Sequence, residues 1–194
     1  MPGRGAAARE AEGLIAKAVK VWARDAESVG GRALAHSAEG GAGRAAGRDV
    51  SRDVGRVFDD AHPGPLGTHG AANTFTDGRY FAGELEHDTM LYRAGDAQAV
   101  RGEPHLGQYW TDTPPESVGA VRRDMAVMET WPTGDTSPLN TGYAVMMPQG
   151  TRYYYGEVAS QGGRYTGGGM QYHVQQPWNM YPRPRKLYEY PLPP

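Results

Sequence analysis

Short stretches in which apolar and polar residues alternate fill the chain from about Phe75 onward. Alternation with a period of two is typical of β-strands with one buried face, and Gly, Pro and Asp residues separate these stretches as turn residues do. Near the C-terminus, after a segment punctuated by prolines, Tyr188 and Tyr190 alternate in the same way and indicate an edge strand or an extended cover. The strands predicted by the pattern cover residues 90–93, 107–111, 142–147, 151–158 and 170–174.

The strand predicted over residues 170–174 follows directly on three glycines, residues 167–169. Three missing side chains let the backbone approach a ligand or another segment closely and permit positive φ angles, which is useful in building a site. The period of two divides the strand into a face directed at the core, with Met170, Tyr172 and Val174, and an opposite polar face, with Gln171, His173 and Gln175.

One helix is predicted within the same region. Thr113 is placed as its N-cap, with proline at the first helical position and Glu116 at the third, and the helix is expected to end at Trp131, which precedes a proline. The strands and this helix together predict an α+β fold with a small mixed or antiparallel sheet as its core. The apolar stripe of the helix consists of Val118, Val121, Met125 and Met128.

The first 72 residues differ in composition, because every tyrosine lies at or beyond Tyr80 and Ala, Gly, Arg and acidic residues dominate the earlier part. Apolar residues at helical spacing over residues 10–29, and more weakly over residues 50–58, predict two amphipathic helices separated by glycines. We therefore predict a helical N-terminal arm over residues 1–72 and a folded module over residues 73–194. An arm that packs on the module and an arm that stays partly mobile both fit this pattern.

Composition and charge exclude several classes of function. The chain has 194 residues and no cysteine, so disulfide frameworks, thiolate nucleophiles and thiolate metal sites are excluded. Its net charge is −2 and its pI is near 6.3, whereas nucleic-acid-binding proteins are normally strongly basic, so no nucleic-acid partner is expected. No stretch has the apolar length of a membrane span or of a signal peptide. Export is therefore expected to require a dedicated secretion machine or a larger carrier.

Familiar catalytic motifs are missing from the sequence. It contains no Gly-x-Ser-x-Gly, no His-Glu-x-x-His and no Walker motif. The six histidines are scattered, and a metal site built from His87, Asp88 and His105 would depend on folding to bring them together, so no metal is predicted. The glycine run is not a dinucleotide-binding fingerprint, because such glycines lead into a helix and these lead into a predicted strand.

Five separated segments resemble, in their order, a known group of toxins. They are residues 91–95 (LYRAG), residues 107–111 (GQYWT), the predicted helix, residues 142–145 (GYAV) and residues 167–172 (GGGMQY). This order resembles the C-terminal toxin modules of bacterial polymorphic toxins, and most of all the tuberculosis necrotizing toxin family of NAD glycohydrolases, which are related in structure to ADP-ribosyltransferases. The resemblance covers roughly residues 80–178. The Thr-Pro and Arg-x-Leu-Pro elements in the middle section of that family are not matched here.

The resemblance implies a fold related to ADP-ribosyltransferases and a secreted or injected toxin that hydrolyses NAD to nicotinamide and ADP-ribose. Such a toxin acts in the cytoplasm of a target cell and depletes its NAD. The resemblance implies no cofactor, because NAD is the substrate. It also implies a cognate immunity protein in the producing cell, as is usual in competition between bacteria.

Several residues are candidates for contacts with NAD. Arg93 is the candidate diphosphate ligand, because a guanidinium group binds phosphate oxygens in a bidentate manner, and a surface salt bridge is the alternative. Tyr109 and Trp110 are candidates for stacking on nicotinamide or adenine, although alternation sends neighbouring side chains to opposite faces, so one of them is expected in the core. Gly168 and Gly169 are expected to expose backbone to NAD. Arg164, in the preceding loop, is expected near phosphate, with a plain surface loop as the alternative.

Gln171 is the candidate that distinguishes hydrolysis from transfer. In ADP-ribosyltransferases the corresponding position typically carries glutamate, whereas the necrotizing toxin family carries glutamine, so the resemblance favours a hydrolase. A neutral amide can still hold a ribose hydroxyl as donor and acceptor. An exposed glutamine on a polar strand face is the alternative. Two other functions stay open: an ADP-ribosyltransferase that modifies a macromolecule, and a non-enzymatic module in which tyrosines contact a partner.

Overall fold

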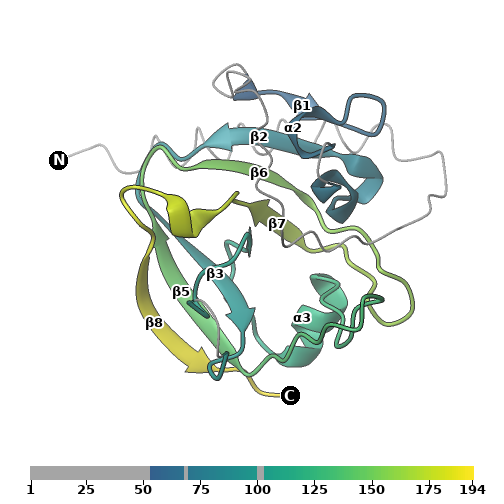
Figure 1. The fold of residues 1–194 in the computed structure, drawn as a ribbon, viewed down its shortest axis with the longest axis vertical. Helices are drawn as coiled ribbons and strands as arrows, with labels where there is room; N and C mark the ends of the chain where they lie inside the picture. Colours follow the sequence, from purple (N-terminus) through teal and green to yellow (C-terminus); the bar gives the residue numbers. More distant parts are fainter. Residues whose placement is uncertain (1–52, 68–69, 100–102) are drawn as a thin grey trace. The chain divides into compact units, whose positions relative to one another are not determined.

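Two antiparallel sheets are formed by the described residues of the computed structural model, which are 53–67, 70–99 and 103–194 (Figure 1). All of these residues belong to one of the two units into which the chain divides, Ala33–Pro194. The larger sheet has the strand order β1-β2-β6-β7-β4, and the smaller sheet has the order β3-β5-β8. The strands are β1 Val57–Phe58, β2 Tyr80–Glu84, β3 Thr89–Gly95, β4 Tyr109–Trp110, β5 Thr141–Met147, β6 Arg152–Glu157, β7 Met170–His173 and β8 Arg185–Pro191.

Short helices connect these strands and confirm, together with them, the predicted α+β class. Each strand predicted from alternation is present, and the proline-rich tail forms β8 at an edge of the smaller sheet. Within the described ranges, no helix is long and apolar enough to cross a membrane. The helices are α2 Gly64–Gly67, η2 Ala71–Thr74, η3 Thr76–Gly78, α3 Val118–Asp124 and η4 Pro177–Asn179.

The predicted start and end of helix α3 are wrong. Ser117, not Thr113, is the N-cap, and its hydroxyl oxygen accepts a hydrogen bond of 3.0 Å from the backbone N–H of Ala120. The residue before a proline is disfavoured in the helical region, so the two successive prolines after Thr113 delay the start of the helix. The helix ends at Asp124 because Ala126, with a φ of 50°, has left the right-handed helical region.

The helix predicted over residues 50–58 is wrong in its described part, because Val57 and Phe58 form strand β1. Phe58 pairs with Tyr80 of β2, and the two rings stack with their centroids 5.1 Å apart. This pair is part of a buried apolar cluster that also contains Leu66 and Phe75. The helix predicted over residues 10–29 lies outside the described residues, and the division of the chain at residue 72 stays a prediction.

Both faces of strand β7 are covered, which contradicts the polar face predicted for Gln171 and His173. These two residues are 4% and 2% exposed, and Tyr172 between them is 8% exposed. Strand β7 lies inside the larger sheet, between β6 and β4. Tyr155 packs on Tyr172 on one face, at 4.6 Å between ring centroids, and Tyr154 lies 6.2 Å from His173 on the other. Any role of Gln171 is therefore that of a buried side chain.

Candidate functional site

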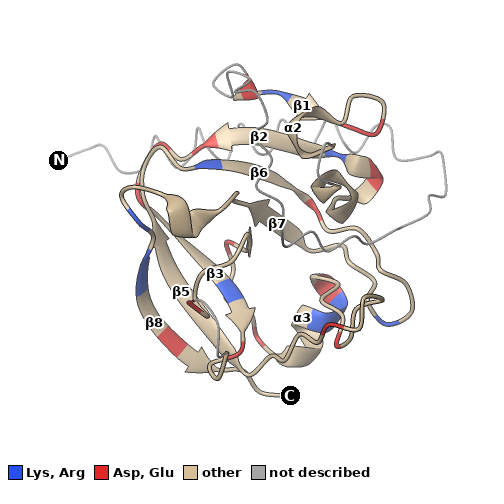
Figure 2. Ribbon diagram, in the orientation of Figure 1, with Lys and Arg blue, Asp and Glu red and all other residues tan. Residues whose placement is uncertain are grey.

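Arg93 is the only charged residue in strands β3, β4, β5 and β7 (Figure 2). It lies opposite Tyr143 in the ladder between β3 and β5. Its Nη1 atom is buried without a hydrogen-bond partner, and its Nε makes only a long contact of 3.5 Å with the carbonyl oxygen of Ala94. Ion pairs with a carboxylate occur at several arginines of the described chain but not at Arg93. The surface salt bridge considered for Arg93 is thus not formed.

Burial of this guanidinium group affects its pKa. Burial lowers the pKa of Arg93 to about 10, and the neighbouring Tyr143 opposes this shift. The group still carries its charge at neutral pH. A buried charge without a counter-ion is unfavourable unless another group or a ligand compensates it. The position therefore suits an anion.

Trp110 and Gly107 enclose the Arg93 side chain. The guanidinium carbon of Arg93 lies 5.7 Å from the centre of the Trp110 ring, which is a cation–π contact. Trp110 is 1% exposed, so it is the member of the Tyr109–Trp110 pair that lies in the core. A Cβ atom at Gly107 would lie 1.4 Å from Nη1 of Arg93, so this place tolerates only glycine while Arg93 keeps its position.

Two further residues, Tyr143 and His105, lie beside Arg93. The hydroxyl group of Tyr143 is also buried and makes no hydrogen bond of good geometry. Burial raises its pKa, and the nearby Thr141 side chain opposes this rise. The His105 ring lies 6.5 Å from the Tyr143 ring. Burial lowers the pKa of His105; nearby Glu103 opposes this shift, whereas the positive charges of the surrounding basic residues add to it. His105 is therefore expected to be neutral at pH 7.

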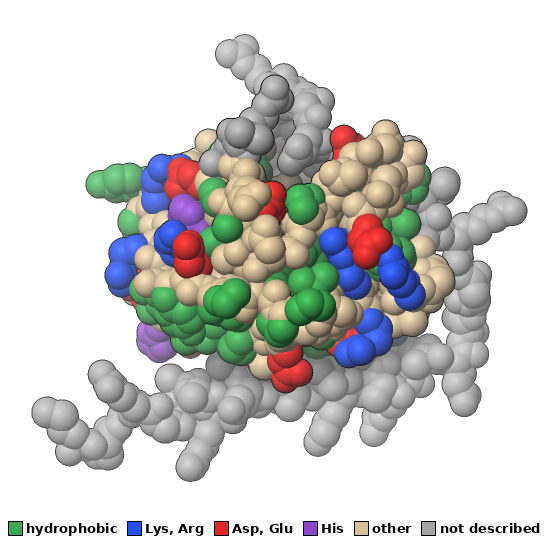
Figure 3. Space-filling model, turned by 90° about the horizontal axis from the view of Figure 1, so that it is seen from below, with side chains coloured by type: hydrophobic (Ala, Val, Ile, Leu, Met, Phe, Trp, Pro, Cys, Tyr) green, Lys and Arg blue, Asp and Glu red, His purple; other side chains and the backbone are tan. Residues whose placement is uncertain are grey.

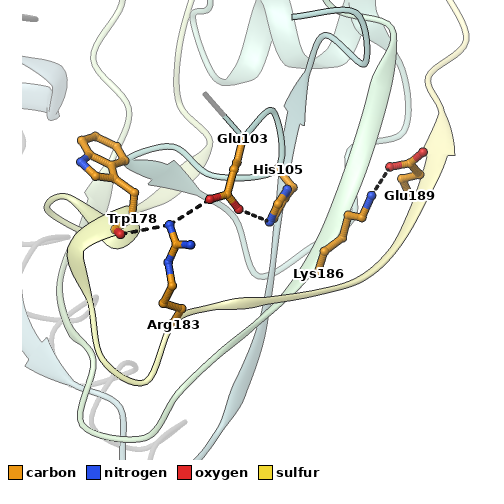
Figure 4. Close-up of polar contacts among 6 residues, drawn as sticks. All are labelled: Glu103, His105, Trp178, Arg183, Lys186 and Glu189. Carbon is orange, nitrogen blue, oxygen red and sulfur yellow. Dashed lines mark hydrogen bonds and ion pairs between the residues drawn. The ribbon is translucent and has the colours of Figure 1, made fainter. Parts of the chain in front are cut away.

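Glu103 joins this region to the segment that precedes β8 (Figure 4). One carboxylate oxygen of Glu103 accepts a hydrogen bond of 2.8 Å from Nη2 of Arg183, and the other lies 3.3 Å from Nε2 of His105. Arg183 also donates to the carbonyl oxygen of Trp178 at 3.1 Å. We call Glu103, His105 and Arg183 the Glu103 clasp. The clasp fixes the start of segment 103–108, which contains Gly107, over Arg93.

Gln171 is held by a different set of contacts. Its Nε2 group donates to the carbonyl oxygen of Thr74 at 3.0 Å and to the hydroxyl oxygen of Thr74 at 3.2 Å. Tyr109 is 40% exposed, and its ring lies 4.8 Å from that of His173. Burial of the Tyr109 hydroxyl raises its pKa, and a hydrogen bond with Thr74 opposes this rise. Thr74 thus connects Tyr109 to Gln171.

The predicted site residues consequently fall into two groups on opposite faces of the larger sheet. Tyr109 pairs with His173 and Trp110 with Tyr172, so the alternation within β4 and β7 sends Tyr109 to the face of Gln171 and Trp110 to the other face. Trp110 is the residue in contact with Arg93. Strand β4 separates the two groups and is the last strand of this sheet. Thr111, directly after it, exchanges two hydrogen bonds of 2.8 Å with Tyr92 of β3.

The three glycines before β7 serve a contact within the protein. The N–H groups of Gly167 and Gly169 donate to the carbonyl oxygens of Arg123 and Asp124 at the end of α3, at 2.8 Å and 2.9 Å. Gly168 donates to the carbonyl oxygen of Val158 at 3.0 Å. These three donors are occupied, so Gly168 and Gly169 do not offer free N–H groups to NAD. The glycine run instead caps the C-terminus of helix α3.

Arg164 lies in the loop before the glycine run and pairs with an acid. Its Nη2 atom lies 2.6 Å from a carboxylate oxygen of Glu129, and its guanidinium carbon lies 5.3 Å from the Tyr165 ring centre. The arrangement matches the surface-loop alternative. The contacts of the Arg164 side chain are with Glu129 and Tyr165, not with Arg93 or Gln171. A role of Arg164 near phosphate stays a prediction.

One face of the described residues carries charges of both signs and no large area of a single charge (Figure 3). Hydrophobic side chains extend across the middle of the face seen from below, with acidic and basic side chains intermingled beside them (Figure 3). A shallow hollow lined by Val54, Leu85 and Gln149 contains none of the candidate residues. Within residues 53–67, 70–99 and 103–194, no group of three metal-ligating side chains occurs. A charged ligand would therefore depend on a local set of cations such as Arg93.

Sequence reasoning missed Gly107, Tyr143, Glu103 and Arg183. Gly107 and Tyr143 lie in segments that resemble the toxin family, but they are 14 and 50 positions from Arg93 in the sequence, so their contact with it could not be predicted. Glu103 and Arg183 are 80 positions apart, and no periodic pattern relates them.

Comparison with protein-family models gives no match, and comparison with curated proteins gives none either. Two solved structures are similar to the chain. That of Tne2 in complex with Tni2 has a TM-score of 0.46 and 14% sequence identity, and the similarity covers 59% of this chain and 92% of the matched chain. That of Tse6 in complex with Tsi6 has a TM-score of 0.42 and 14% identity, and covers 71% of this chain and 87% of the other. At TM-scores below 0.5, neither similarity carries an argument about function.

Proposed function

We propose that this chain is a bacterial toxin module that hydrolyses NAD to nicotinamide and ADP-ribose. The observation that carries the proposal is the buried Arg93 guanidinium, which has no carboxylate partner and contacts Trp110. Both residues lie in segments that resemble NAD glycohydrolases. A buried guanidinium binds phosphate oxygens strongly, and the diphosphate of NAD supplies them.

Gln171 is the proposed ligand of the nicotinamide ribose. Both of its hydrogen bonds to Thr74 start from Nε2 and fix the plane of the amide, so that its oxygen can accept a hydrogen bond from a ribose hydroxyl. Tyr109 presents the exposed ring of this group and is the proposed stacking residue. Strand β4 is only two residues long, and Thr111 after it is hydrogen-bonded to Tyr92 of β3, so an extended ligand that contacts both Arg93 and Tyr109 passes the other end of β4, where segment 103–108 leads into it.

The proposed reaction needs positioning rather than a strong acid. The bond between C1′ of the ribose and the nicotinamide nitrogen breaks, and its electron pair stays on that nitrogen, so a cationic pyridinium leaves as a neutral molecule. Water forms the new bond to C1′ and releases one proton to solvent. Fixed dipoles such as the Gln171 amide stabilise the cationic sugar as it develops.

The direct test incubates the purified chain with NAD and follows free nicotinamide by chromatography. Arg93→Ala is expected to lower kcat/KM by about 100-fold or more, because it removes a charge-assisted contact to phosphate. Arg152→Ala is the matched control, because this exposed arginine only pairs with Glu84, at 3.5 Å. Release of nicotinamide by the unchanged chain at no more than the rate in buffer would refute the proposal.

Gln171 needs a variant that separates a chemical role from a structural one. Gln171→Ala removes one of the two donors to the carbonyl of Thr74, the other being the N–H of Ala159 at 2.9 Å, and it empties space at a side chain that is 4% exposed, so it is expected to destabilise the fold by about 1–3 kcal/mol. Gln171→Glu keeps the shape and offers a carboxylate to the ribose. If the amide has only a structural role, the activity of each variant should fall in proportion to its loss of melting temperature, and a variant with an unchanged melting temperature should keep its activity.

The same NAD reaction distinguishes two other functions. With NAD labelled in its adenylate part and a lysate of target cells, an ADP-ribosyltransferase would leave label on macromolecules, whereas the proposed hydrolase releases labelled ADP-ribose. A binding module would neither bind nor cleave NAD, and Gln171→Ala would leave its partner binding unchanged.

Delivery into target cells and neutralisation by a cognate immunity protein belong to the same proposal. Expression in the cytoplasm of a bacterial host is expected to lower cellular NAD and arrest growth, and Arg93→Ala is expected to relieve both effects. A growth arrest that persists in Arg93→Ala without a fall in NAD would contradict NAD depletion as the cause.

A further inference from the structure

Two buried polar atoms without partners lie in neighbouring positions of the smaller sheet. They are Nη1 of Arg93 and the hydroxyl group of Tyr143, and the two residues are paired in the ladder between β3 and β5. A buried polar group without a hydrogen bond is rare in native proteins and typically marks a place for a ligand, an ion or water. Two such groups from paired positions indicate one shared ligand.

Segment 103–108 covers the Arg93 guanidinium. Gly107 is in direct contact with it, since a Cβ atom there would overlap Nη1. The segment turns back at once, because the N–H of Leu106 donates to the carbonyl oxygen of Glu103 at 2.8 Å. A ligand that reaches Arg93 from solvent must therefore displace this segment or pass beside it.

The Glu103 carboxylate holds this segment down from within a group of cations. Its two oxygens contact Arg183 and His105 (Figure 4), and the His105 ring lies 6.5 Å from that of Tyr143, the residue paired with Arg93. The positive charges of Arg93, Arg183 and Lys186 all lower the pKa of His105. Lys186 has a carboxylate of its own, that of Glu189, at 2.7 Å. A carboxylate among cations occupies the place that suits a phosphate group.

We infer that Arg93, Tyr143 and Arg183 form a binding site for a phosphate group, and that Glu103 acts as a competing carboxylate which the phosphate displaces. The inference rests on the proposed function for the identity of the phosphate as part of NAD. Tyr143 donates its hydroxyl proton to a phosphate oxygen, and the Arg93 and Arg183 guanidinium groups supply the charge. His105, in contact with Glu103, is a positioning residue for the competing carboxylate.

The contacts of Glu103 are weak enough to exchange. The side chains of Arg183 and Glu103 are 53% and 44% exposed. Exposed ion pairs contribute little to stability because water and salt screen them. A phosphate with two negative charges competes favourably with one carboxylate for the same guanidinium group, so the Glu103 clasp opens when the ligand binds.

The test measures binding of inorganic pyrophosphate to the full chain by titration calorimetry at low ionic strength. Glu103→Gln keeps the shape of the side chain and removes its charge, so it is expected to lower the Kd by about two- to fivefold, the size of an exposed ion pair. Arg183→Ala is expected to raise the Kd by about tenfold. The exposed pair of Glu84 and Arg152 gives matched controls, Glu84→Gln and Arg152→Ala, which should leave the Kd unchanged.

The opposite signs of the two effects are decisive. If the Glu103 clasp only stabilised the fold, Glu103→Gln and Arg183→Ala would break the same ion pair and change pyrophosphate binding in the same direction. Equal directions, or a Kd that neither variant changes, would overturn the inference, as would failure of the unchanged chain to bind pyrophosphate.

The same variants show whether the inference or the proposed function fails. Opposite effects on pyrophosphate binding without any cleavage of NAD would support the phosphate site and refute the hydrolase. Cleavage of NAD with a KM that Glu103→Gln and Arg183→Ala shift in the same direction would support the hydrolase and refute the competing role of Glu103.

Discussion

Replacement of Gly107 by alanine tests the position of the Arg93 guanidinium directly. The new Cβ atom would lie 1.4 Å from Nη1, 2.2 Å from Cζ and 2.7 Å from Nη2 of Arg93. The backbone of Gly107 is not in the left-handed region, so alanine is tolerated there by the main chain itself. The guanidinium group must therefore move, and Trp110 and Tyr143 limit where it can go.

The expected loss of stability follows from this overlap. Inserting a methyl group into a filled interior typically costs about 1–3 kcal/mol, and the displaced guanidinium also loses its cation–π contact with Trp110, which contributes about 1 kcal/mol. We expect Gly107→Ala to lower the free energy of unfolding by about 2–4 kcal/mol. In Arg93→Ala the overlapping atoms are gone, so the same change of Gly107 should then have almost no effect.

The assay is a double-mutant cycle by urea unfolding of the unchanged chain, both single variants and the double variant. Gly119→Ala is the matched control, because its Cβ would meet nothing nearer than the Ser117 hydroxyl at 3.7 Å and it lies in helix α3, where alanine should stabilise by about 0.5–1 kcal/mol. A loss of stability that is the same with and without Arg93 would refute the reasoning, because the two residues would then not be in contact.

Three other predictions concern stability. Arg122 donates to the carbonyl oxygens of Val127 and Met128 at 3.0 Å and 2.8 Å and to that of Ser137 at 2.5 Å; Arg122→Met should therefore lower the free energy of unfolding by about 3 kcal/mol, while exposed Arg123→Ala leaves the urea midpoint unchanged. Burial lowers the pKa of His173 to about 4, so the unfolded chain binds a proton that the folded chain does not. The contribution of neutral His173 to the free energy of unfolding should be fully present above pH 6.5, and about 3 kcal/mol of it should be lost as the pH falls from 6.5 through 4. A His173→Phe variant whose stability falls with the same slope in acid would contradict the role given to His173. Ser117→Ala should cost about 1 kcal/mol in thermal unfolding whereas Thr113→Ala should cost much less, and equal effects would restore the cap predicted from sequence.

Local patterns located the strands because each signal lies within the strand itself. The alternation around Tyr143 and Tyr154 reports a strand whether or not its partner is known, and even the tail with Tyr188 pairs as predicted. The same pattern misjudged Gln171 and His173, because a period of two shows only that two faces differ. Whether the second face meets solvent depends on Thr74 and Tyr154, which come from other parts of the chain.

The glycine run shows the same limit at the candidate site. The sequence indicated that residues 167–169 allow a close backbone approach, to a ligand or to another segment. The segment that they approach is the end of helix α3, and its carbonyl oxygens carry no sequence signal. Arg93 could be singled out because it interrupts apolar strand residues, whereas Arg183 and Glu103 become relevant only through the loops that bring them together.

Strand β4 lies between Gln171 and Arg93, so it limits the shape of any ligand that contacts both residues. Because Tyr109 and Trp110 are adjacent, their side chains lie on opposite faces of the larger sheet, with Gln171 on one side and Arg93 on the other. One small ligand cannot contact both, and the two hydrogen bonds between Thr111 and Tyr92 of β3 close one end of β4. An elongated ligand with its anion at one end and its reactive bond at the other can reach both groups only past the other end of β4. NAD has this shape. The contact of segment 103–108 with Arg93 then makes entry at this end of β4 depend on the Glu103 clasp. The charge of one exposed carboxylate should therefore change KM more than kcat.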